Sequence, residues 1–513
     1  MKKIYKHIAL LIPLVSLLAM NSCDKGFQEV NVDNFSLTTI DPDYLFSNAE
    51  RLSVMSLVDY DASIVQQVIT VQPGTLAGAN FNIDLDINTR KLFDNHSTGP
   101  LKNIYTIINA TKSDPKRINL YNMTRILKAY IYMQLVDTYG DVPYTEAGQA
   151  FLTGIYLPKY DAQATIYDDI LKELAEATKA LDATQAIPAQ ELIYAGNISK
   201  WKKLGNSLLL RAAIRFTKVD AVKAKANVVI ALDPANGGVI EVVADNAKIS
   251  FNTTFSNSAV GAFQGSERGN YYLGEPFVNY LKTTNDPRLS RISVRYQTPA
   301  GLFPSATGTA DTISSHQIGM PFGYNGGNIV TAPNFPGILG AAFAYSQPNR
   351  ATVTAQSAQA VLVSASQTLL LKAEAAQRTY ITGSPATFYN AGVKAHMDMM
   401  AVNYTALAIP ASSQDAYLAA NPFDPAKALE MINTQYWISS YTIWGEAWAN
   451  FRRSGFPVLT PNPYPSQDPL VKGGFIRRMT YPDREWSVNG PNVQAAVDRQ
   501  GPDNLVTRVF WDK

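Results

Sequence analysis

Apolar side chains recur every three or four residues in several parts of this chain, which is the spacing of a helix with one buried face. The pattern is clearest over residues 199–216, where Trp201, Leu204 and Leu208 fall on one face. Ser199 precedes the first turn, where its hydroxyl can accept a hydrogen bond from a free backbone N–H. The spacing therefore predicts an amphipathic helix that begins near Ser199.

Two longer segments carry the same period. Residues 118–139 form a broad apolar stripe that Gly140 ends, and residues 161–181 repeat isoleucine or leucine every four positions behind Asp161, a candidate cap. Weaker helical patterns cover residues 43–59, 97–112, 219–232, 355–380, 385–403 and 425–451. Paired helices with short connections predict a mainly α fold of stacked hairpins of the tetratricopeptide type, although the chain shows no clean sequence repeat.

The helical pattern stops over residues 233–350. Gly, Asn, Ser, Thr and Pro are frequent there, and aromatic residues are scattered through the segment. We expect a helical scaffold over about 40–232 and 351–455, an insertion of loops and short strands between them, and an irregular segment over about 456–513. A long loop-rich insertion in a compact domain is usually functional.

The N-terminus has the layout of a lipoprotein signal. Three lysines precede an apolar stretch over residues 8–20, and Cys23, the only cysteine of 513 residues, follows within three positions. The stretch is too short to span a bilayer as a helix. We expect removal of residues 1–22 and acylation of Cys23, which leaves a single domain over 23–513; the alternative is an ordinary secretory signal beside an incidental cysteine.

Charge and composition exclude several classes of protein. Lys and Arg number 44 against 42 Asp and Glu, and removal of residues 1–22 takes away three lysines, so the mature chain has a net charge of about −1. With 17% charged residues and no run of like charge, the chain has no basic patch for nucleic acid. A lone cysteine forms no disulfide within the chain, so a large apolar core must hold the fold.

Catalytic and metal-binding motifs are scarce. The three histidines of the mature chain, His96, His316 and His396, are isolated in sequence. Asp84, Asp86 and Asn88 resemble the start of a calcium loop, but the glycine and glutamate that such a loop requires are missing. The alternation over residues 81–88 indicates a strand with one polar face, and structural calcium is a weak possibility. Since any chain with this many carboxylates can supply a pair, a glycoside hydrolase stays open as the alternative.

Five landmarks occur together in order. They are Cys23, the turn Asp137–Tyr144, the helix Trp201–Arg215, the segment Leu371–Ala375 and the tail Tyr481–Asn492. Together they resemble the SusD/RagB outer-membrane lipoproteins, and the tail resembles the SusD-like type 2 subgroup. The resemblance covers essentially the whole mature chain.

The resemblance implies a nutrient-binding lipoprotein of the outer membrane that is not an enzyme and needs no cofactor. Such a protein would face the cell exterior, capture a glycan or in some members a peptide, and deliver it to a TonB-dependent SusC-like transporter. The acidic residues that mark surface display in the family are reduced here to Asp24 and Glu29. The alternative is a carbohydrate-active enzyme anchored at the same membrane.

Two regions combine aromatic rings with polar side chains in expected loops. The first, residues 72–96, contains Phe81, Asn82, Arg90 and Phe93. The second, residues 263–324, contains Arg268, Asn270, Tyr271, Tyr272, Phe322 and Tyr324. Rings beside hydrogen-bonding groups suit sugars and peptides, so these are the candidate ligand residues, with core packing as the alternative for each of them.

Overall fold

The computed structural model describes residues 40–55, 60–72, 82–296, 310–340, 342–403 and 408–513. Its helices are α3 (Pro42–Leu52), α4 (Asp61–Ile64), α6 (Asp86–Thr89), α7 (Lys91–Thr98), α8 (Pro100–Thr111), α9 (Ile118–Tyr139), α10 (Ala150–Thr153), α11 (Gln163–Ala180), α12 (Ile198–Arg215), α13 (Ala221–Leu232), α14 (Glu275–Thr283), α15 (Leu289–Ile292), α16 (Ala365–Gln377), α17 (Pro385–Asn403), α18 (Ala411–Ala420), α19 (Ala428–Ser439), α20 (Trp444–Ser454) and α21 (Asp483–Gln500). The prediction of a mainly α fold is confirmed. Cys23 and the expected signal lie outside the described residues.

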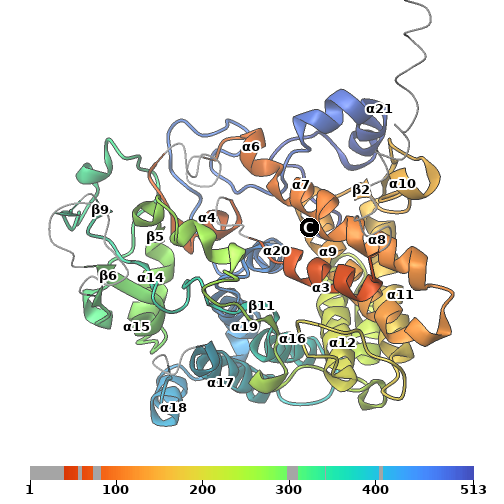
Figure 1. Ribbon diagram of the computed structural model, residues 1–513. Helices are drawn as coiled ribbons and strands as arrows, with labels where there is room; N and C mark the ends of the chain where they lie inside the picture. Colours follow the sequence, from red (N-terminus) through yellow and green to blue (C-terminus); the bar gives the residue numbers. More distant parts are fainter. Residues whose placement is uncertain (1–39, 56–59, 73–81, 297–309, 341, 404–407) are drawn as a thin grey trace, which may run out of the picture. The chain divides into compact units, whose positions relative to one another are not determined.

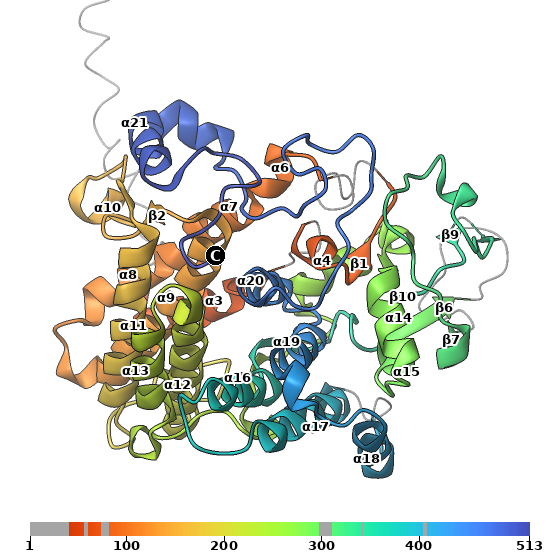
Figure 2. The ribbon, with the colours of Figure 1, turned by 180° about the vertical axis from the view of Figure 1, so that it is seen from behind.

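Neighbouring helices pack as antiparallel hairpins (Figures 1 and 2). Helix α8 packs on α9, α9 on α11, α11 on α12, and α12 on α13. A second set follows, in which α16 contacts α12, α17 and α19. Each hairpin buries its apolar stripe against its neighbours, as expected for stacked helical pairs.

Glycines allow two of these helix pairs to approach closely. A Cβ atom on Gly205 of α12 would lie 1.9 Å from the Thr178 hydroxyl of α11, and one on Gly392 of α17 would lie 2.9 Å from Leu370 of α16. Since real Cβ contacts are longer, any larger residue at Gly205 would push α12 away from α11.

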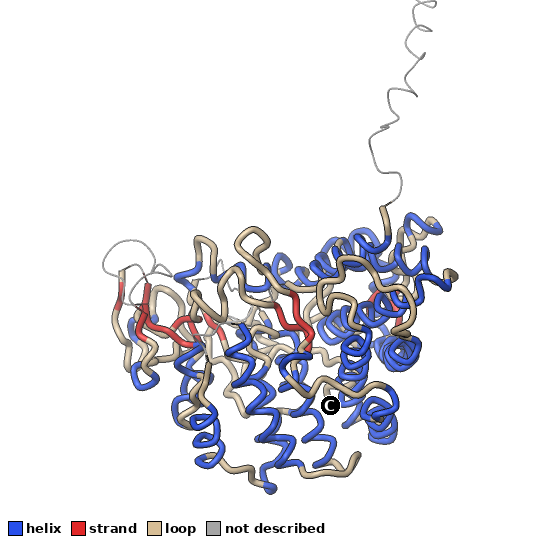
Figure 3. Tube along the Cα trace, turned by 60° about the horizontal axis from the view of Figure 1, so that its bottom comes forward, coloured by secondary structure: helices blue, strands red, loops and turns tan. Residues whose placement is uncertain are grey.

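The strands are short pieces between the helices (Figure 3). They are β1 (Val68–Ile69), β2 (Val142–Pro143), β3 (Tyr160–Asp161), β4 (Ala247–Ile249), β5 (Tyr272–Leu273), β6 (Ser293–Tyr296), β7 (Ala310–Asp311), β8 (Ile338–Leu339), β9 (Ala342–Phe343), β10 (Gln347–Pro348) and β11 (Ala360–Val363). Antiparallel pairs join β1 to β5, β2 to β3, β4 to β11 and β8 to β9, and β6 lies between β7 and β10.

Both predicted N-terminal helix caps are wrong, whereas Gly140 ends α9 as predicted. Asn197 caps α12 two residues before Ser199, and its side chain accepts a hydrogen bond from the backbone N–H of Lys200. Asp161 instead accepts the N–H groups of Tyr144 and Thr145, so it holds the turn that follows α9. The Asp141 carboxylate accepts the first N–H of α11, from Gln163.

Three predicted element boundaries are also corrected. The helix expected from residue 355 begins at Ala365, because residues 360–363 pair as strand β11 and Ser364 closes a capping box with Gln367. The helix expected over 425–451 is divided into α19 and α20 at Thr442, whose φ is +73°. The helix expected to reach residue 59 ends at Leu52.

Two further predictions of secondary structure are wrong. Residues 86–88, expected as the end of a strand over 81–88, belong to the helical turn α6. The irregular segment expected over 456–513 contains the helix α21, which continues past Pro491 through a kink at Asn489.

A buried carboxyl pair joins α3 to the loop before α12. Glu50 is 0% exposed and accepts the N–H of Leu192 at 2.9 Å, beside Glu191. The Glu191 carboxylate accepts the N–H groups of Ile193, Tyr194 and Gly196. Burial, and then the charge of Glu191, raise the pKa of Glu50 well above its ordinary value.

We expect Glu50→Gln to stabilise the protein at alkaline pH. The folded-state pKa of Glu50 lies above the unfolded value of 4.5, so the wild type loses stability as the pH rises above about 4.5. Glutamine keeps the acceptor for Leu192 and removes this loss. Chemical denaturation should show little difference near pH 4 and a gain of at least about 1.4 kcal/mol at pH 8. Glu430→Gln, at an exposed position, serves as the control; equal pH profiles for the Glu50→Gln variant and the wild type would contradict the prediction.

Candidate ligand-binding surface

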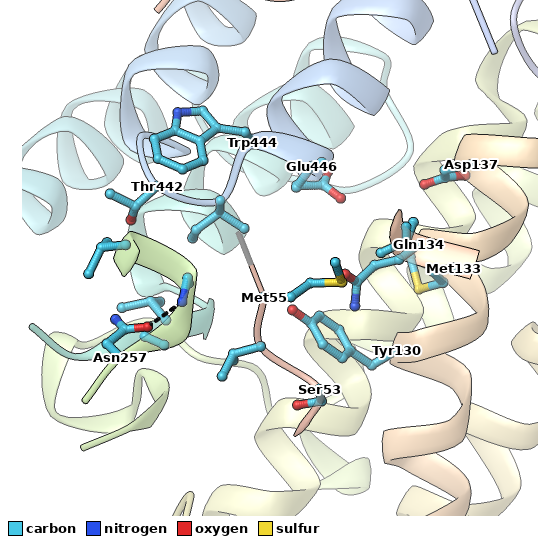
Figure 4. Close-up of a pocket in the computed structure, with 18 of the residues that line it drawn as sticks. Ser53, Met55, Tyr130, Met133, Gln134, Asp137, Asn257, Thr442, Trp444 and Glu446 are labelled. Carbon is cyan, nitrogen blue, oxygen red and sulfur yellow. Dashed lines mark hydrogen bonds between the residues drawn. The ribbon is translucent and has the colours of Figure 1, made fainter. Parts of the chain in front are cut away.

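An interior cavity lies between α9, the start of α20 and the residues that follow α3 (Figure 4). Tyr130, Met133 and Gln134 line it from α9, opposite Thr442 and Trp444. Its volume is about 60 Å³, which is room for a few water molecules, whereas sites for drug-sized ligands span about 300–1,000 Å³. The cavity is therefore too small for an oligosaccharide or a peptide.

The charged groups beside this cavity are already paired. Arg215 donates to Glu446 at 2.7 Å and to Asp137 at 3.2 Å, and all three side chains are buried. Burial raises the pKa of Asp137 more than Arg215 lowers it, whereas Arg215 and Arg211 outweigh burial and lower the pKa of Glu446. The cluster ties α9, α12 and α20 together and presents no free acid or base to a substrate.

Aromatic rings gather in a second place, around β5 and the loops that follow β7. The aromatic cluster consists of Tyr272, Phe322, Tyr324, Phe335, Phe343 and Tyr345. Tyr272 and Tyr345 are buried, whereas the four other rings are only partly buried. Adjacent rings lie 6.0–6.3 Å apart, with Phe335 packed edge to face on Phe343 and Tyr345. Partly buried rings on a fixed base offer apolar area at little conformational cost.

Short strands fix the backbone beneath these rings. Ile69 of β1 pairs with Tyr272 of β5, and Gly274 bridges Met320 in parallel. The N–H of Gly326 donates to the carbonyl of Val71 at 2.9 Å. These bonds hold residues 66–72 and 318–326 side by side.

A third segment, residues 460–467, completes the surface. Gln66 donates to the carbonyl of Thr460 at 2.6 Å, and Asn325 donates to the Tyr464 hydroxyl at 3.4 Å. Gly323 has φ +94°, and a Cβ atom there would lie 2.6 Å from Pro463. The ring of Tyr464 thereby comes next to the loop that carries Phe322 and Tyr324.

One hydroxyl of the cluster has no partner among the described residues. The Tyr345 ring is 2% exposed, and its hydroxyl is buried without a hydrogen bond. Burial, and then the negative charge of Glu275, raise the pKa of Tyr345 to about 12. The hydroxyl is thus neutral and enclosed by the protein, so it is no contact for a ligand at the surface.

The first predicted region contributes little to this surface. Phe81 lies outside the described residues. Asn82 is buried and donates to Gln467, and Phe93 packs edge to face on Tyr139 in the main core. Arg90 pairs with Asp86 on α6. Asn82 therefore fixes the 460–467 segment, and the Phe93 ring has no surface to offer.

The second predicted region is divided by the fold. Tyr271 packs on Phe263 in the main core, whereas Tyr272 joins the aromatic cluster together with Phe322 and Tyr324. Arg268 and Asn270 hydrogen bond within their own turn, to the carbonyl of Gly265 and to Glu267. Sequence reasoning did not include Phe335, Phe343, Tyr345 and Tyr464 in the site; only their position in or after the loop-rich insertion could have suggested them.

The described part of the chain has neither a metal-binding cluster nor a candidate membrane span. No group of three or more His, Cys, Asp and Glu side chains there is close enough to hold a metal ion. Asp84, from the calcium-like sequence, accepts a hydrogen bond from Thr480. None of the described helices is both long and apolar enough to cross a bilayer.

Comparisons with known proteins cover nearly the whole chain. A family model described as starch-binding and associating with the outer membrane matches residues 34–482. A solved chitin-binding protein is 28% identical over 92% of this chain and 100% of its own, with a TM-score of 0.78. A SusD homologue from Bacteroides uniformis is 25% identical over 92% and 99% of the two chains, with a TM-score of 0.75. A chitin-binding SusD homologue from Flavobacterium johnsoniae, 22% identical over 92% and 98%, shares the fold with a TM-score of 0.75. No curated protein matches the chain.

Proposed function

Since this chain belongs to the SusD-like family of starch-binding proteins associated with the outer membrane, we propose that it is a non-catalytic lipoprotein that captures a glycan at the cell surface. It would deliver this cargo to a TonB-dependent SusC-like transporter. A peptide is the less favoured cargo, because the two named chitin-binding proteins of the same fold bind a glycan.

The aromatic cluster carries this proposal. Sugar rings have apolar faces that stack on aromatic side chains and hydroxyl groups that bind amides. Phe322 and Tyr324 lie beside Asn325 and Tyr464, which supply both kinds of contact. The Phe322 and Tyr324 side chains are partly exposed, whereas the interior cavity is far smaller than an oligosaccharide.

A glycoside hydrolase is the second candidate. Hydrolysis requires two carboxyl groups roughly 5–9.5 Å apart. Residues 66–72, 272–274, 318–346 and 460–467 contain no Asp or Glu. Glu275 is a carboxylate whose charge acts on Tyr345, but these segments supply no carboxylate pair of their own, so their composition favours binding. Release of reducing ends from a glycan that binds would overturn the non-catalytic assignment.

Tyr324→Ala and Phe322→Ala should each weaken glycan binding by at least about 1 kcal/mol, or roughly fivefold in Kd, the free energy of one lost stacking contact. Isothermal calorimetry against a panel of plant and host oligosaccharides measures the loss. Tyr156→Ala is the matched control, because Tyr156 is 74% exposed and lies outside the aromatic cluster. Thermal melts of each variant separate lost contacts from unfolding. If both variants bind like the control, the cluster is not the site.

The anchor is tested at Cys23. We expect Cys23→Ser to abolish acylation and to release a folded protein into the soluble fraction, because Cys23 precedes every described helix. Mass spectrometry of the N-terminal peptide and membrane fractionation measure the change, with circular dichroism as the control for folding. A variant that still carries lipid would show that another residue is the anchor.

The transporter partner requires a separate test. Affinity purification from outer membranes solubilised in mild detergent should recover a TonB-dependent barrel with the wild-type protein. Recovery of no barrel protein from cells grown on the bound glycan would contradict this part of the proposal.

A further inference from the structure

Prolines leave the segment over residues 460–467 with few backbone hydrogen-bond donors. Its sequence is Thr-Pro-Asn-Pro-Tyr-Pro-Ser-Gln, with Pro461, Pro463 and Pro465 at every second position. Proline has no N–H group and fixes its own φ, so this stretch is stiff and is a poor partner for a strand. None of its eight residues belongs to a helix or a strand. The position of Tyr464 therefore depends on side chains that reach the segment.

Two buried side chains from the early part of the chain hold the ends of this segment. The Gln66 amide donates to the carbonyl of Thr460 at 2.6 Å. The Asn82 amide donates to the side chain of Gln467 at 2.9 Å, and the Asn82 carbonyl accepts the N–H of Asp468. The segment is thus attached at its first and last residues to positions nearly 400 residues earlier.

Gln467 carries the attachment to the middle of the segment. Its amide donates to the carbonyls of Asn462 and Tyr464 at 3.0 and 2.9 Å. The N–H of Tyr464 donates to the side chain of Asn462 at 3.0 Å. These bonds fix the backbone that bears the Tyr464 ring, which is partly exposed beside the loop of Phe322 and Tyr324.

Both attaching residues have a left-handed backbone. Gln66 has φ +57° and Asn82 has φ +50°, and their side chains are 3% and 5% exposed. Asparagine adopts this conformation readily, but glutamine does so rarely. Such conformations persist only where the surrounding structure enforces them, and they cluster at ligand sites. The strain at Gln66 places its amide against Thr460.

We infer that Gln66 and Asn82 are positioning residues of the proposed ligand surface, which hold residues 460–467 so that the Tyr464 ring lies ready to contact the ligand. The inference rests on the proposed function and adds Tyr464 to its contacts. Gln66 and Asn82 are buried, so they act through the segment and not on the ligand. A ring that is held in place before binding loses less conformational entropy when the ligand docks.

The first test needs no ligand. Gln66→Gly removes the amide, and glycine accepts the positive φ without strain. Hydrogen exchange of a peptide over 458–471, measured by mass spectrometry on the full chain, should become at least about fivefold faster, the effect of one lost hydrogen bond. Peptides from α9 should exchange as in the wild type. Gln190→Gly is the matched control, because Gln190 has φ +61° and is exposed.

Unchanged exchange over 458–471 in the Gln66→Gly variant would overturn the inference. Asn82→Asp tests the other end, since aspartate keeps the size and the backbone preference of asparagine but has no donor for Gln467. It should accelerate exchange in the same peptide. Thermal melts of each variant show whether the rest of the fold is intact.

The second test is a double-mutant cycle with maltohexaose and chitohexaose as probes, since the family is described as starch-binding and two relatives as chitin-binding. Tyr464→Ala should raise the Kd at least about fivefold and Gln66→Gly at least about threefold. The double variant should bind within about twofold of Tyr464→Ala, because Gln66 acts through that ring. Gln190→Gly should bind like the wild type.

Two results of this cycle would overturn the inference. They are a Kd that Gln66→Gly leaves unchanged, and losses that multiply in the double variant, which would show that Gln66 does not act through Tyr464. A wild type that binds neither probe counts against the proposed function instead, and the exchange measurement still decides whether Gln66 and Asn82 hold the segment.

Discussion

Glu374→Ala should lower the free energy of unfolding by about 3–5 kcal/mol, because it leaves a buried guanidinium without its partner. Glu374 of α16 and Arg453 of α20 are 0% exposed and form two parallel bonds of 2.7 Å. Arg453 also donates to Asn433 of α19. The pair therefore connects three helices of the scaffold, and its loss affects each of their contacts.

The same pair predicts a dependence on pH. Burial alone would raise the pKa of Glu374, but Arg453 and Arg378 outweigh it and lower the pKa from 4.5 to about 2. The contribution of the carboxylate is therefore fully present above about pH 4.5 and declines as the pH falls toward 2. Urea denaturation at pH 7 and pH 3 should show a smaller gap between variant and wild type at the lower pH.

An exposed ion pair gives the control for Glu374. Lys394 and Asp415 lie 2.5 Å apart with side chains 42% and 63% exposed, and such pairs contribute about 0–1 kcal/mol. If Asp415→Ala and Glu374→Ala destabilise the protein equally, the buried pair does not hold the scaffold as described.

Trp201→Ala should cost about 3–5 kcal/mol, the usual loss for a large aromatic side chain removed from a core. The Trp201 indole is 0% exposed and packs between Phe46 of α3 and Tyr194, whose ring centroids lie 5.8 and 6.1 Å away. Removing it opens a cavity between α3, α12 and the loop before α12. Chemical denaturation followed by circular dichroism measures the change.

A second tryptophan provides the comparison. Trp486 of α21 is only partly buried and donates to Asp503, so Trp486→Ala should cost less than half as much. An unchanged midpoint for Trp201→Ala would mean that its helix face does not pack as the structure places it.

Helical periodicity predicted the scaffold well, because a repeated apolar face specifies both the element and what it buries. The boundaries expected for α9 and α17, residues 118–139 and 385–403, agree with the structure. Caps were harder to predict, since Ser199 and Asp161 satisfy the sequence rule for a cap while the fold uses Asn197 and leaves Asp161 to another turn. Which polar group caps a helix depends on the chain that packs around its end.

Helix α21 was missed for a related reason. Gly490 and Pro491 normally end a helix. Here Asn489 donates to the carbonyl of Pro158, and Asn492 donates to that of Leu157. These tertiary hydrogen bonds hold the kinked segment in helical form, and the local sequence pattern does not predict them.

The aromatic cluster could be predicted only in part. Tyr271 and Tyr272 are adjacent, yet one faces the main core and the other the cluster, a distinction that depends on the pairing of β5 with β1. Tyr464 reaches the cluster from 139 positions after Asn325. The sequence identifies the aromatic residues, but the pairing of distant segments determines which of their side chains are exposed.

The last helices and loops of the described chain close onto its early helices. Trp511 donates to Asp137, Tyr481 donates to the carbonyl of Asp141, and Arg478 donates to that of Tyr139. A nascent chain that has reached residue 460 contains every hairpin of the scaffold, but the end of α9 still lacks these partners. We therefore expect the end of α9 to complete its packing only after residues 478–511 have been synthesised, so a chain truncated before residue 478 should lack the native contacts at this end of the helix.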